Sequence, residues 1–387
     1  MLDSKVLNID AKVLNSSREL DDFTDNSVEM DGVAYAIPEY SRKEVENAGD
    51  ILIAPFASAP ERRRAINIVD NWRASHAYPL QVIYMRLREL ARGVNAEALI
   101  AQRRKRLVSI ENKLALLPTK LPKMQDIGGC RAIVEDVTDV WLLATQYDKA
   151  AADVRHGRSR RIKVNDYIRS PRSTGYRSLH YVYEYDSEAP KYEAYKGLRI
   201  EIQIRTKLQH LWATAVETVS AYTGHALKSN LGDDRWLRFF VLMSSVFALR
   251  ENCPVVPNTS EDLEVLRAEL MTLSFELNAL DVLFGCRVAT QYITKEVPKA
   301  HNFLLVLNSE THTISVTPFR KGEQKQAELE VRETEERFKG DDSMQAVLVS
   351  VESVHSIRKA YPNYYLDIEE FSKIVEDFVG YTPANRL

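Results

Sequence analysis

Two carboxylates in this chain of 387 residues stand among residue types that can act on phosphates. Asp126 directly precedes Ile-Gly-Gly-Cys-Arg131, where the two glycines let the backbone approach a ligand closely. Glu201, Gln203 and Arg205 alternate with isoleucines, so they share one face of a strand. A carboxylate flanked by an amide and a guanidinium suits a general base, and carboxylate oxygens suit Mg²⁺. The simpler alternatives are a turn at Asp126 and a solvated strand face at Glu201.

A basic cluster precedes the first carboxylate. Four consecutive cations, Arg103–Arg106, are followed by a serine and a further lysine. On a helix or tight loop these side chains converge on a polyphosphate, with Arg103, Lys105, Ser109 and Lys113 as the candidates. The alternative is a solvated charged face, which is the usual fate of a charge run.

A loop shaped by proline and glycine presents an aromatic side chain between Asp166 and His180. Tyr176 lies there among cations, next to Arg177. Such a tyrosine can stack on a nucleobase, an interaction worth about 1–3 kcal/mol in nucleic-acid complexes. The alternative is a turn that leads into a strand and carries an incidental aromatic residue.

Strands that alternate with helices are predicted around these residues and would hold them in place. The clearest strand is Leu198–Thr206, and an apolar stripe predicts a helix at Lys207–Thr223 directly after it. Helical spacing fits most of residues 40–117. The remaining elements of this region are a strand at 130–134, a helix at 138–150, a loop up to residue 178 and a strand at 179–185. This order indicates an α/β layer built on a mixed sheet.

The composition changes after Cys253, where a Pro/Ser/Thr stretch reads as a linker before a helix at 260–283. A small α+β module follows, with strands at 303–307, 313–317 and 344–351 and helices at 327–339 and 366–379. The domain boundaries we expect are a poorly ordered or peripheral arm at 1–35, a catalytic domain at 36–250, a linker and helix at 251–285 and a C-terminal module at 286–387.

The composition excludes several classes of protein. Hydrophobic residues make up 45% and charged residues 28%, which is ordinary for globular domains. The longest mostly apolar run, Phe239–Leu249, is too short for a bilayer span of about 20 residues. We expect no signal peptide, no membrane association and a cytoplasmic location. Three dispersed cysteines predict neither disulfides nor zinc, and no P-loop or G-x-G-x-x-G motif is present.

Four motifs in this order resemble the synthetase domain of the RelA/SpoT homologue family. They are R-x-K-x-x-x-S-I-x-x-K at Arg103–Lys113, D-I-x-G-x-R at Asp126–Arg131, D-Y-I…P…G-Y-x-S-L-H at Asp166–His180 and E-I-Q-I-R-T at Glu201–Thr206. The resemblance spans about residues 80–235. It implies a nucleotidyltransferase-like mixed sheet flanked by helices. The activity it implies is pyrophosphate transfer from ATP to a ribose 3′-hydroxyl with release of AMP.

The resemblance also implies a role for each matching residue. ATP would contact Arg103, Lys105, Ser109, Lys113 and Arg131. Asp126 would coordinate Mg²⁺, and Glu201 would share the metal or activate the hydroxyl. The acceptor nucleotide would meet Tyr176, Arg177, His180, Gln203 and Arg205.

Departures from the motifs point to a particular branch of the family. Members that make alarmones commonly read K-D-Y-I and G-Y-Q-S-L-H, whereas this chain has Asn165 and Arg177 at the changed positions. The segment at 71–79 and the C-terminal module resemble the toxic small synthetases, particularly the fused toxin–antitoxin CapRel group. That resemblance implies a tRNA 3′-CCA acceptor, blocked translation and release by a phage protein such as a major capsid protein. Tyr361 and Tyr364 match its inhibitory Y-x-x-Y element.

The charge distribution favours a tRNA acceptor. The net charge is −3, yet eight Lys/Arg and a single acid lie between Arg155 and Arg177. The residues we expect on the tRNA backbone are Arg158, Arg160, Arg161, Lys163 and Arg172. The alternative for this segment is a flexible loop kept soluble by charge.

Two other functions stay open at this point: an enzyme that makes a free alarmone such as (p)ppGpp or (p)ppApp, and a degenerate domain that only binds a partner.

Overall fold

The computed structural model describes residues 27–30, 33–150, 158–223, 234–283, 300–308, 313–320, 322–338, 344–350 and 364–380. Two compact units make up the chain. The sheet unit comprises Ser17–Tyr167 and Ser178–Lys207, and the bundle unit includes Ile168–Arg177 and Leu208–Leu387.

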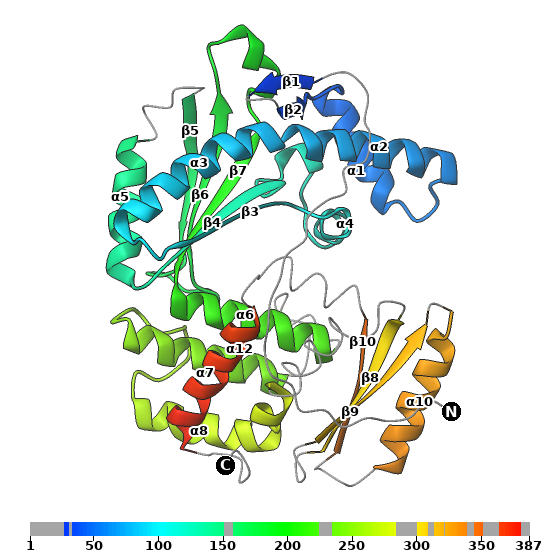
Figure 1. Cartoon of the computed structure of the whole chain (residues 1–387), viewed down its shortest axis with the longest axis vertical. Helices are drawn as coiled ribbons and strands as arrows, with labels where there is room; N and C mark the ends of the chain where they lie inside the picture. The colour runs from blue at the N-terminus through cyan, green and yellow to red at the C-terminus, as the bar shows by residue number, and fades with distance from the viewer. Residues whose placement is uncertain are drawn as a thin grey trace. The chain divides into compact units, whose positions relative to one another are not determined.

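A five-stranded mixed sheet is the centre of the sheet unit (Figure 1). Its strand order is β3-β4-β7-β6-β5. The strands are β3 (Leu99–Arg104), β4 (Gly128–Val134), β5 (Arg158–Asp166), β6 (Leu179–Asp186) and β7 (Arg199–Thr206). Strands β4 and β7 are parallel and the other pairs are antiparallel. Helices flank this sheet, which confirms the predicted fold class.

The two faces of the sheet differ because side chains alternate along each strand. Ile200, Ile202 and Ile204 are fully buried on one face. Helices α3 (Ala77–Val94) and α5 (Val137–Ala150) pack on β4 and β7. In Figure 1, α3 lies across the sheet and α5 stands beside it. Strand register places Gly129 and His180 beside Glu201 and Gln203 on the opposite, polar face. The alternation predicted for β7 is therefore confirmed.

Two strands lie where we predicted other structure. Residues 99–104 form an edge strand paired with β4, although the sequence pattern favoured a helix or tight loop. Residues 158–166 form the opposite edge, paired with β6, where we expected a loop. Their sequences are rich in arginine and carry almost no period-2 alternation, so pairing with a buried neighbour decides their structure.

The N-terminal part of the sheet unit also contains more structure than predicted. A hairpin of β1 (Ser27–Met30) and β2 (Val33–Ala36) lies within the segment we expected to be a peripheral arm. Helices α1 (Arg42–Ile53) and α2 (Ala59–Ser75) follow, and each begins with a capping box. Ser41 with Glu44 and Ser58 with Glu61 satisfy the first backbone amides of these helices. The smaller elements of this unit are α4 (Leu107–Leu116), η1 (Leu121–Lys123) and η2 (Pro190–Tyr195).

Four helices share one apolar core in the bundle unit. They are α6 (Lys207–Thr223), α7 (Asp234–Arg250), α8 (Leu263–Glu276) and α12 (Tyr364–Val379). The buried apolar residues of α12 are Ile368, Phe371, Val375 and Val379, and they join the core formed by the other three helices. The last helix is thus a member of the bundle. The predicted boundaries at residues 250 and 285 do not coincide with the two compact units.

The bundle unit also contains a three-stranded antiparallel sheet, and α10 (Gln324–Arg337) packs on it. Its strands are β8 (Ala300–Asn308), β9 (Thr313–Arg320) and β10 (Met344–Ser350), in the order β10-β8-β9. A small α+β arrangement was predicted for this part of the chain, and these elements match it. Among the helices that the structure describes, none is both long and apolar enough to cross a membrane.

Candidate active site

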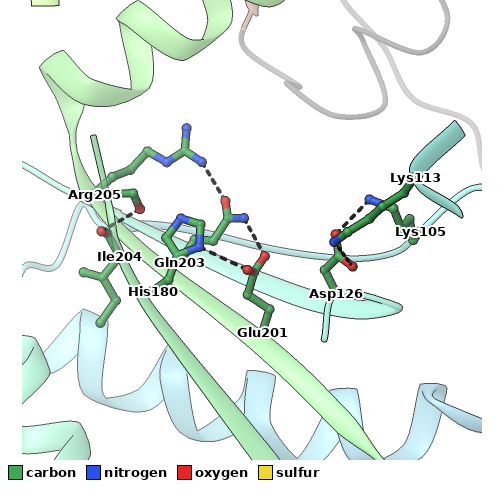
Figure 2. A network of polar contacts seen from close by, with 9 residues as sticks. Lys105, Lys113, Asp126, His180, Glu201, Gln203, Ile204 and Arg205 are labelled. Carbon is green, nitrogen blue, oxygen red and sulfur yellow. Dashed lines mark hydrogen bonds and ion pairs between the residues drawn. The ribbon is translucent and has the colours of Figure 1, made fainter. Parts of the chain in front are cut away.

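Asp126 lies between two lysines on the sheet unit (Figure 2). Its two carboxylate oxygens accept hydrogen bonds from Lys105 Nζ at 2.8 Å and Lys113 Nζ at 2.9 Å. Lys105 follows β3 directly, and Lys113 lies in the last turn of α4. Two of the predicted polyphosphate ligands thus meet at the predicted metal ligand. The strand and the helix together, rather than a single helix, bring them there.

The two lysines keep Asp126 ionised. Burial of the carboxyl opposes ionisation, but the nearby charges and hydrogen bonds of Lys105 and Lys113 outweigh it and hold the pKa of Asp126 below its usual value. Two cations on one carboxylate also leave the local charge positive. Such a group is prepared for an anionic ligand, because the lysines can turn from the carboxylate to phosphate oxygens without a change of protonation.

Glu201 is held by donors from two strands. His180 Nδ1 lies 3.0 Å from Glu201 Oε1, and Gln203 Nε2 donates to Glu201 Oε2 at 2.8 Å. Burial raises the pKa of this carboxyl, and the charge of Asp126 adds to that effect. Together, the hydrogen bonds from His180 and Gln203 and the charge of His180 outweigh these two effects and keep the pKa of Glu201 below its usual value. The second carboxylate is therefore also ionised at neutral pH.

Arg205 continues this line of contacts along β7. Its Nη2 donates to Gln203 Oε1 at 2.7 Å, and only 2% of the residue is exposed. Figure 2 shows Glu201, Gln203 and Arg205 side by side, with His180 approaching from the neighbouring strand. Three of the residues predicted to contact an acceptor thus contact one another or Glu201.

The other predicted ATP ligands belong to the same unit. Arg103 is exposed on β3, in register with Gly129, and Arg131 is half-buried on β4, in register with Gln203. These registers place both arginines on the polar face of the sheet. Ser109 is half-buried on α4, one turn before Lys113.

The sequence did not predict one residue that supports the basic cluster near Asp126. Arg73, on α2, donates from Nε to the backbone oxygen of Lys105 at 2.9 Å and pairs with Asp70. This contact fixes the backbone at Lys105, between β3 and α4, within the basic cluster. The segment 71–79 was singled out for its resemblance to toxic synthetases, but nothing in its spacing indicated a contact with residue 105.

Tyr176 and Arg177 belong to the bundle unit. Tyr176 is half-buried, and its ring lies edge-on to Trp212 with 6.4 Å between the centroids. Arg177 is 2% exposed and donates to the backbone oxygens of Ile168 and Pro254. Its predicted role at the acceptor conflicts with this placement, because the guanidinium binds carbonyl groups inside the fold. The base-stacking role of Tyr176 stays a prediction.

The predicted tRNA-contacting residues lie mainly on the edge strand β5. Arg160, Arg161 and Lys163 are exposed; Arg160 pairs with Glu184 at 3.0 Å, and Arg161 lies over the ring of Tyr181. Arg172 is exposed in the bundle unit, and Arg158 begins β5 with a side chain outside the described residues. Tyr361 lies outside the described residues, and only the backbone of Tyr364 is described.

The arrangement of carboxylates and lysines defines a class of protein. An ionised carboxylate can take the proton of a hydroxyl group, and lysines beside a second carboxylate can hold a polyphosphate. These are the requirements of an enzyme that transfers a phosphate-containing group to an alcohol.

Comparisons with known proteins identify the family. The family described as "Region found in RelA / SpoT proteins" matches residues 102–226. The GTP pyrophosphokinase YwaC of Bacillus subtilis is 30% identical over 151 residues, which cover 38% of this chain and 68% of that protein. The GTP pyrophosphokinase YjbM of the same organism is 32% identical over 111 residues, 27% of this chain and 47% of that protein. The chain belongs to the RelA/SpoT family and is an ATP-dependent pyrophosphotransferase.

Solved structures of small alarmone synthetases are similar to part of the chain. The small alarmone synthetase 2 from Bacillus subtilis matches with a TM-score of 0.38 and 22% identity. This match covers 47% of this chain and 94% of that one. The small alarmone synthetase 1 from Bacillus subtilis, bound to its product pppGpp, matches with a TM-score of 0.37 and 20% identity over 45% of this chain and 88% of that one.

Proposed function

We propose that the chain transfers the β,γ-pyrophosphate of ATP to a ribose 3′-hydroxyl, with Glu201 as the group that takes the hydroxyl proton. The observation that carries this proposal is the pair of ionised carboxylates, one beside two lysines and the other held by His180 and Gln203. An alcohol is a weak nucleophile until a base accepts its proton, and a polyphosphate needs positive charge arranged in advance.

The reaction balances with these residues. The 3′-oxygen attacks the β-phosphorus of ATP, and the bond from that phosphorus to the oxygen shared with the α-phosphate breaks. AMP leaves, and Glu201 accepts the proton of the 3′-hydroxyl. Lys105 and Lys113 bind phosphate oxygens, with Arg103 and Arg131 on the same polar face.

The donor set fits Mg²⁺, which binds through one or two carboxylates together with substrate phosphates. Asp126 and Glu201 are both held ionised, and the charge of Asp126 acts on Glu201. Within the described ranges, no three His, Cys, Asp or Glu side chains group as metal ligands, so substrate oxygens would complete the shell. Bound there, Mg²⁺ would neutralise phosphate charge. Lys105 and Lys113 would then move from Asp126 to the phosphates.

For the acceptor we propose the 3′-CCA end of tRNA. Three exposed cations, Arg160, Arg161 and Lys163, lie on one edge strand of the sheet unit. Backbone phosphates of a nucleic acid are the partners that such a row favours. The second candidate is a guanosine nucleotide that would yield a free alarmone, and the names of the Bacillus subtilis relatives favour it.

A labelling experiment with the full chain distinguishes the two acceptors. The unsubstituted chain and the Tyr364→Ala chain, in which inhibition should be relieved, are each incubated with γ-labelled ATP and, separately, with bulk tRNA, GDP, GTP, AMP or ATP as acceptor. Label on tRNA that disappears when the CCA end is removed supports the tRNA acceptor. Label on a free nucleotide instead overturns it in favour of alarmone synthesis. Label on no acceptor, from the unsubstituted chain and from the Tyr364→Ala chain alike, contradicts the proposed transfer itself.

The basic edge strand gives a quantitative test of the tRNA acceptor. In the triple variant Arg160→Ala, Arg161→Ala, Lys163→Ala we expect KM for tRNA to rise about 10-fold at low salt. The slope of log KM against log salt should fall by about 0.9 for each phosphate that the variant no longer neutralises. The matched control is Arg88→Ala, Arg92→Ala, Lys149→Ala, which removes equal charge from helices α3 and α5 instead of from β5. Equal effects in both triple variants would contradict a specific contact at β5.

We further propose that the C-terminal part holds the enzyme inactive until a phage protein, such as a major capsid protein, binds it. Support for this regulation comes from the Y-x-x-Y element at Tyr361 and Tyr364 and from the resemblance of the chain to self-inhibited toxins. Tyr364→Ala is expected to arrest the growth of cells that express the chain without any phage. Lys373→Ala, an exposed change on the same helix, should leave growth normal. Normal growth of the Tyr364→Ala strain at equal expression would contradict the inhibitory role.

A further inference from the structure

Three side chains of β7 are joined end to end on the polar face of the sheet. Arg205 Nη2 donates to Gln203 Oε1 at 2.7 Å, and Gln203 Nε2 donates to Glu201 Oε2 at 2.8 Å. The strand repeat of two brings the three side chains into line, and Figure 2 shows the chain of contacts running from the buried guanidinium to the carboxylate.

The chemistry of the three groups permits only one direction for this chain of contacts. A guanidinium has donors and no acceptor, and an ionised carboxylate has acceptors and no donor. The amide between them must therefore turn its oxygen to Arg205 and its nitrogen to Glu201. Removal of Arg205 would take away the donor that anchors the amide oxygen. The amide could then rotate away from Glu201 and leave one carboxylate oxygen without its donor.

Glu201 has a second fixed support on β6. His180 Nδ1 lies 3.0 Å from the other carboxylate oxygen, and the ring of Tyr167 packs edge-on against His180 with 5.3 Å between the centroids. Donors from two neighbouring strands thus hold both oxygens of one carboxylate. Since Arg205 is 2% exposed, its position is set by the fold rather than by a ligand.

We infer that Arg205 and Gln203 are positioning residues that orient Glu201, and that they make no contact with the acceptor. The inference rests on the proposed role of Glu201 in activating the hydroxyl. It differs from the acceptor-binding role that the family resemblance implies for both residues. A positioned carboxylate affects turnover, because displacement of a reacting group by about 1 Å can cost about 100-fold in rate.

The kinetic test separates positioning from acceptor binding. In Arg205→Met and Gln203→Leu we expect kcat to fall about 10- to 100-fold, with KM for ATP and for the acceptor changed less than about 3-fold. Arg205→Lys keeps a donor for the amide oxygen and should recover part of kcat. The control is Arg199→Met, on the same strand and face, two residues before Glu201. The guanidinium of Arg199 contacts Glu184 and the backbone of Lys123. This variant should stay within about 2-fold of the unsubstituted chain.

A spectroscopic readout makes the test independent of activity. With ¹⁵N-labelled glutamine, the side-chain amide of Gln203 is assigned by its loss in Gln203→Leu. In the unsubstituted chain, the Gln203 amide proton bonded to Glu201 should exchange slowly with solvent. In Arg205→Met the protection should be lost, and in Arg199→Met it should be kept. Thermal unfolding of each variant shows whether it is folded, and Gln203→Leu carries the kinetic test if Arg205→Met does not fold.

Different outcomes overturn the inference and the proposed function. A rise in KM for the acceptor at unchanged kcat means that these residues contact the acceptor, and it overturns positioning. An amide signal of Gln203 that is unaffected by Arg205→Met also overturns it. If neither the unsubstituted chain nor the Tyr364→Ala chain transfers label to any acceptor, the proposed function fails, and the amide signal alone decides the positioning role.

Discussion

Substitution of Glu201 by glutamine is expected to lower kcat for pyrophosphate transfer by about 10²–10⁴-fold, the range that a positioned general base contributes. Glutamine keeps the size and an acceptor oxygen, so the contact with His180 can persist, but the amide cannot take a proton. The loss should appear in kcat rather than in KM for ATP, because the ATP-binding lysines contact Asp126 and not Glu201. Single-turnover labelling with saturating ATP measures it.

Glu184→Gln is the matched control for this measurement. Glu184 lies on β6, on the same face of the sheet as His180, and pairs with Arg160 and Arg199 at the far end of that face. Its substitution is expected to change kcat less than about 3-fold. Activity of Glu201→Gln within about 5-fold of the unsubstituted chain would exclude a base role for Glu201 and point to another group as proton acceptor.

The second large effect is expected in the bundle unit, where Phe371→Ala should reduce the free energy of unfolding by about 3–5 kcal/mol. Phe371 is fully buried, and its ring lies 6.1 Å from that of Phe240 and 5.9 Å from that of Phe247. Truncation removes these ring contacts and leaves a cavity that the packed helices can close only partly. Urea denaturation gives the size of the loss, and hydrogen exchange shows whether it lies in α6, α7, α8 and α12.

Lys373→Ala provides the comparison on the same helix, since its side chain is exposed and its loss should cost less than about 0.5 kcal/mol. A loss below about 1 kcal/mol in Phe371→Ala would mean that α12 is not packed as described. Deletion of everything after residue 285 would remove α12 from the bundle core, so inhibition should be tested by point substitution in the full chain.

Helices and strands with a periodic pattern in their own residues were predicted correctly, whereas strands that depend on distant neighbours were not. The alternation of Leu198–Thr206 predicted β7 and its two faces, because a strand repeats every two residues whatever surrounds it. The apolar stripe after it predicted α6 for the same kind of reason. Edge strands β3 and β5 were missed, since their exposed, arginine-rich sequences obtain their structure from pairing with β4 and β6.

In the candidate site, the sequence likewise identified the residues, and the tertiary structure showed how they group. Motif spacing alone selected Asp126, Glu201 and the lysines, because their residue types carry the chemistry. Their grouping came from long-range contacts: Lys105 and Lys113 reach Asp126 from a strand end and a helix, 21 and 13 residues away in sequence. Nothing local to residue 73 indicates that its guanidinium holds the backbone of Lys105.

The sequence by itself determined the kind of chemistry and the face of β7 on which Glu201, Gln203 and Arg205 lie, because residue type and strand period are local properties. Only the tertiary structure decided that Arg205 is buried, that Arg177 binds carbonyl groups inside the bundle unit, and that the last helix belongs to the bundle core. Burial depends on residues distant in the chain, and a guanidinium suits a phosphate or a backbone carbonyl equally well by its chemistry. What surrounds it in the folded chain selects between them.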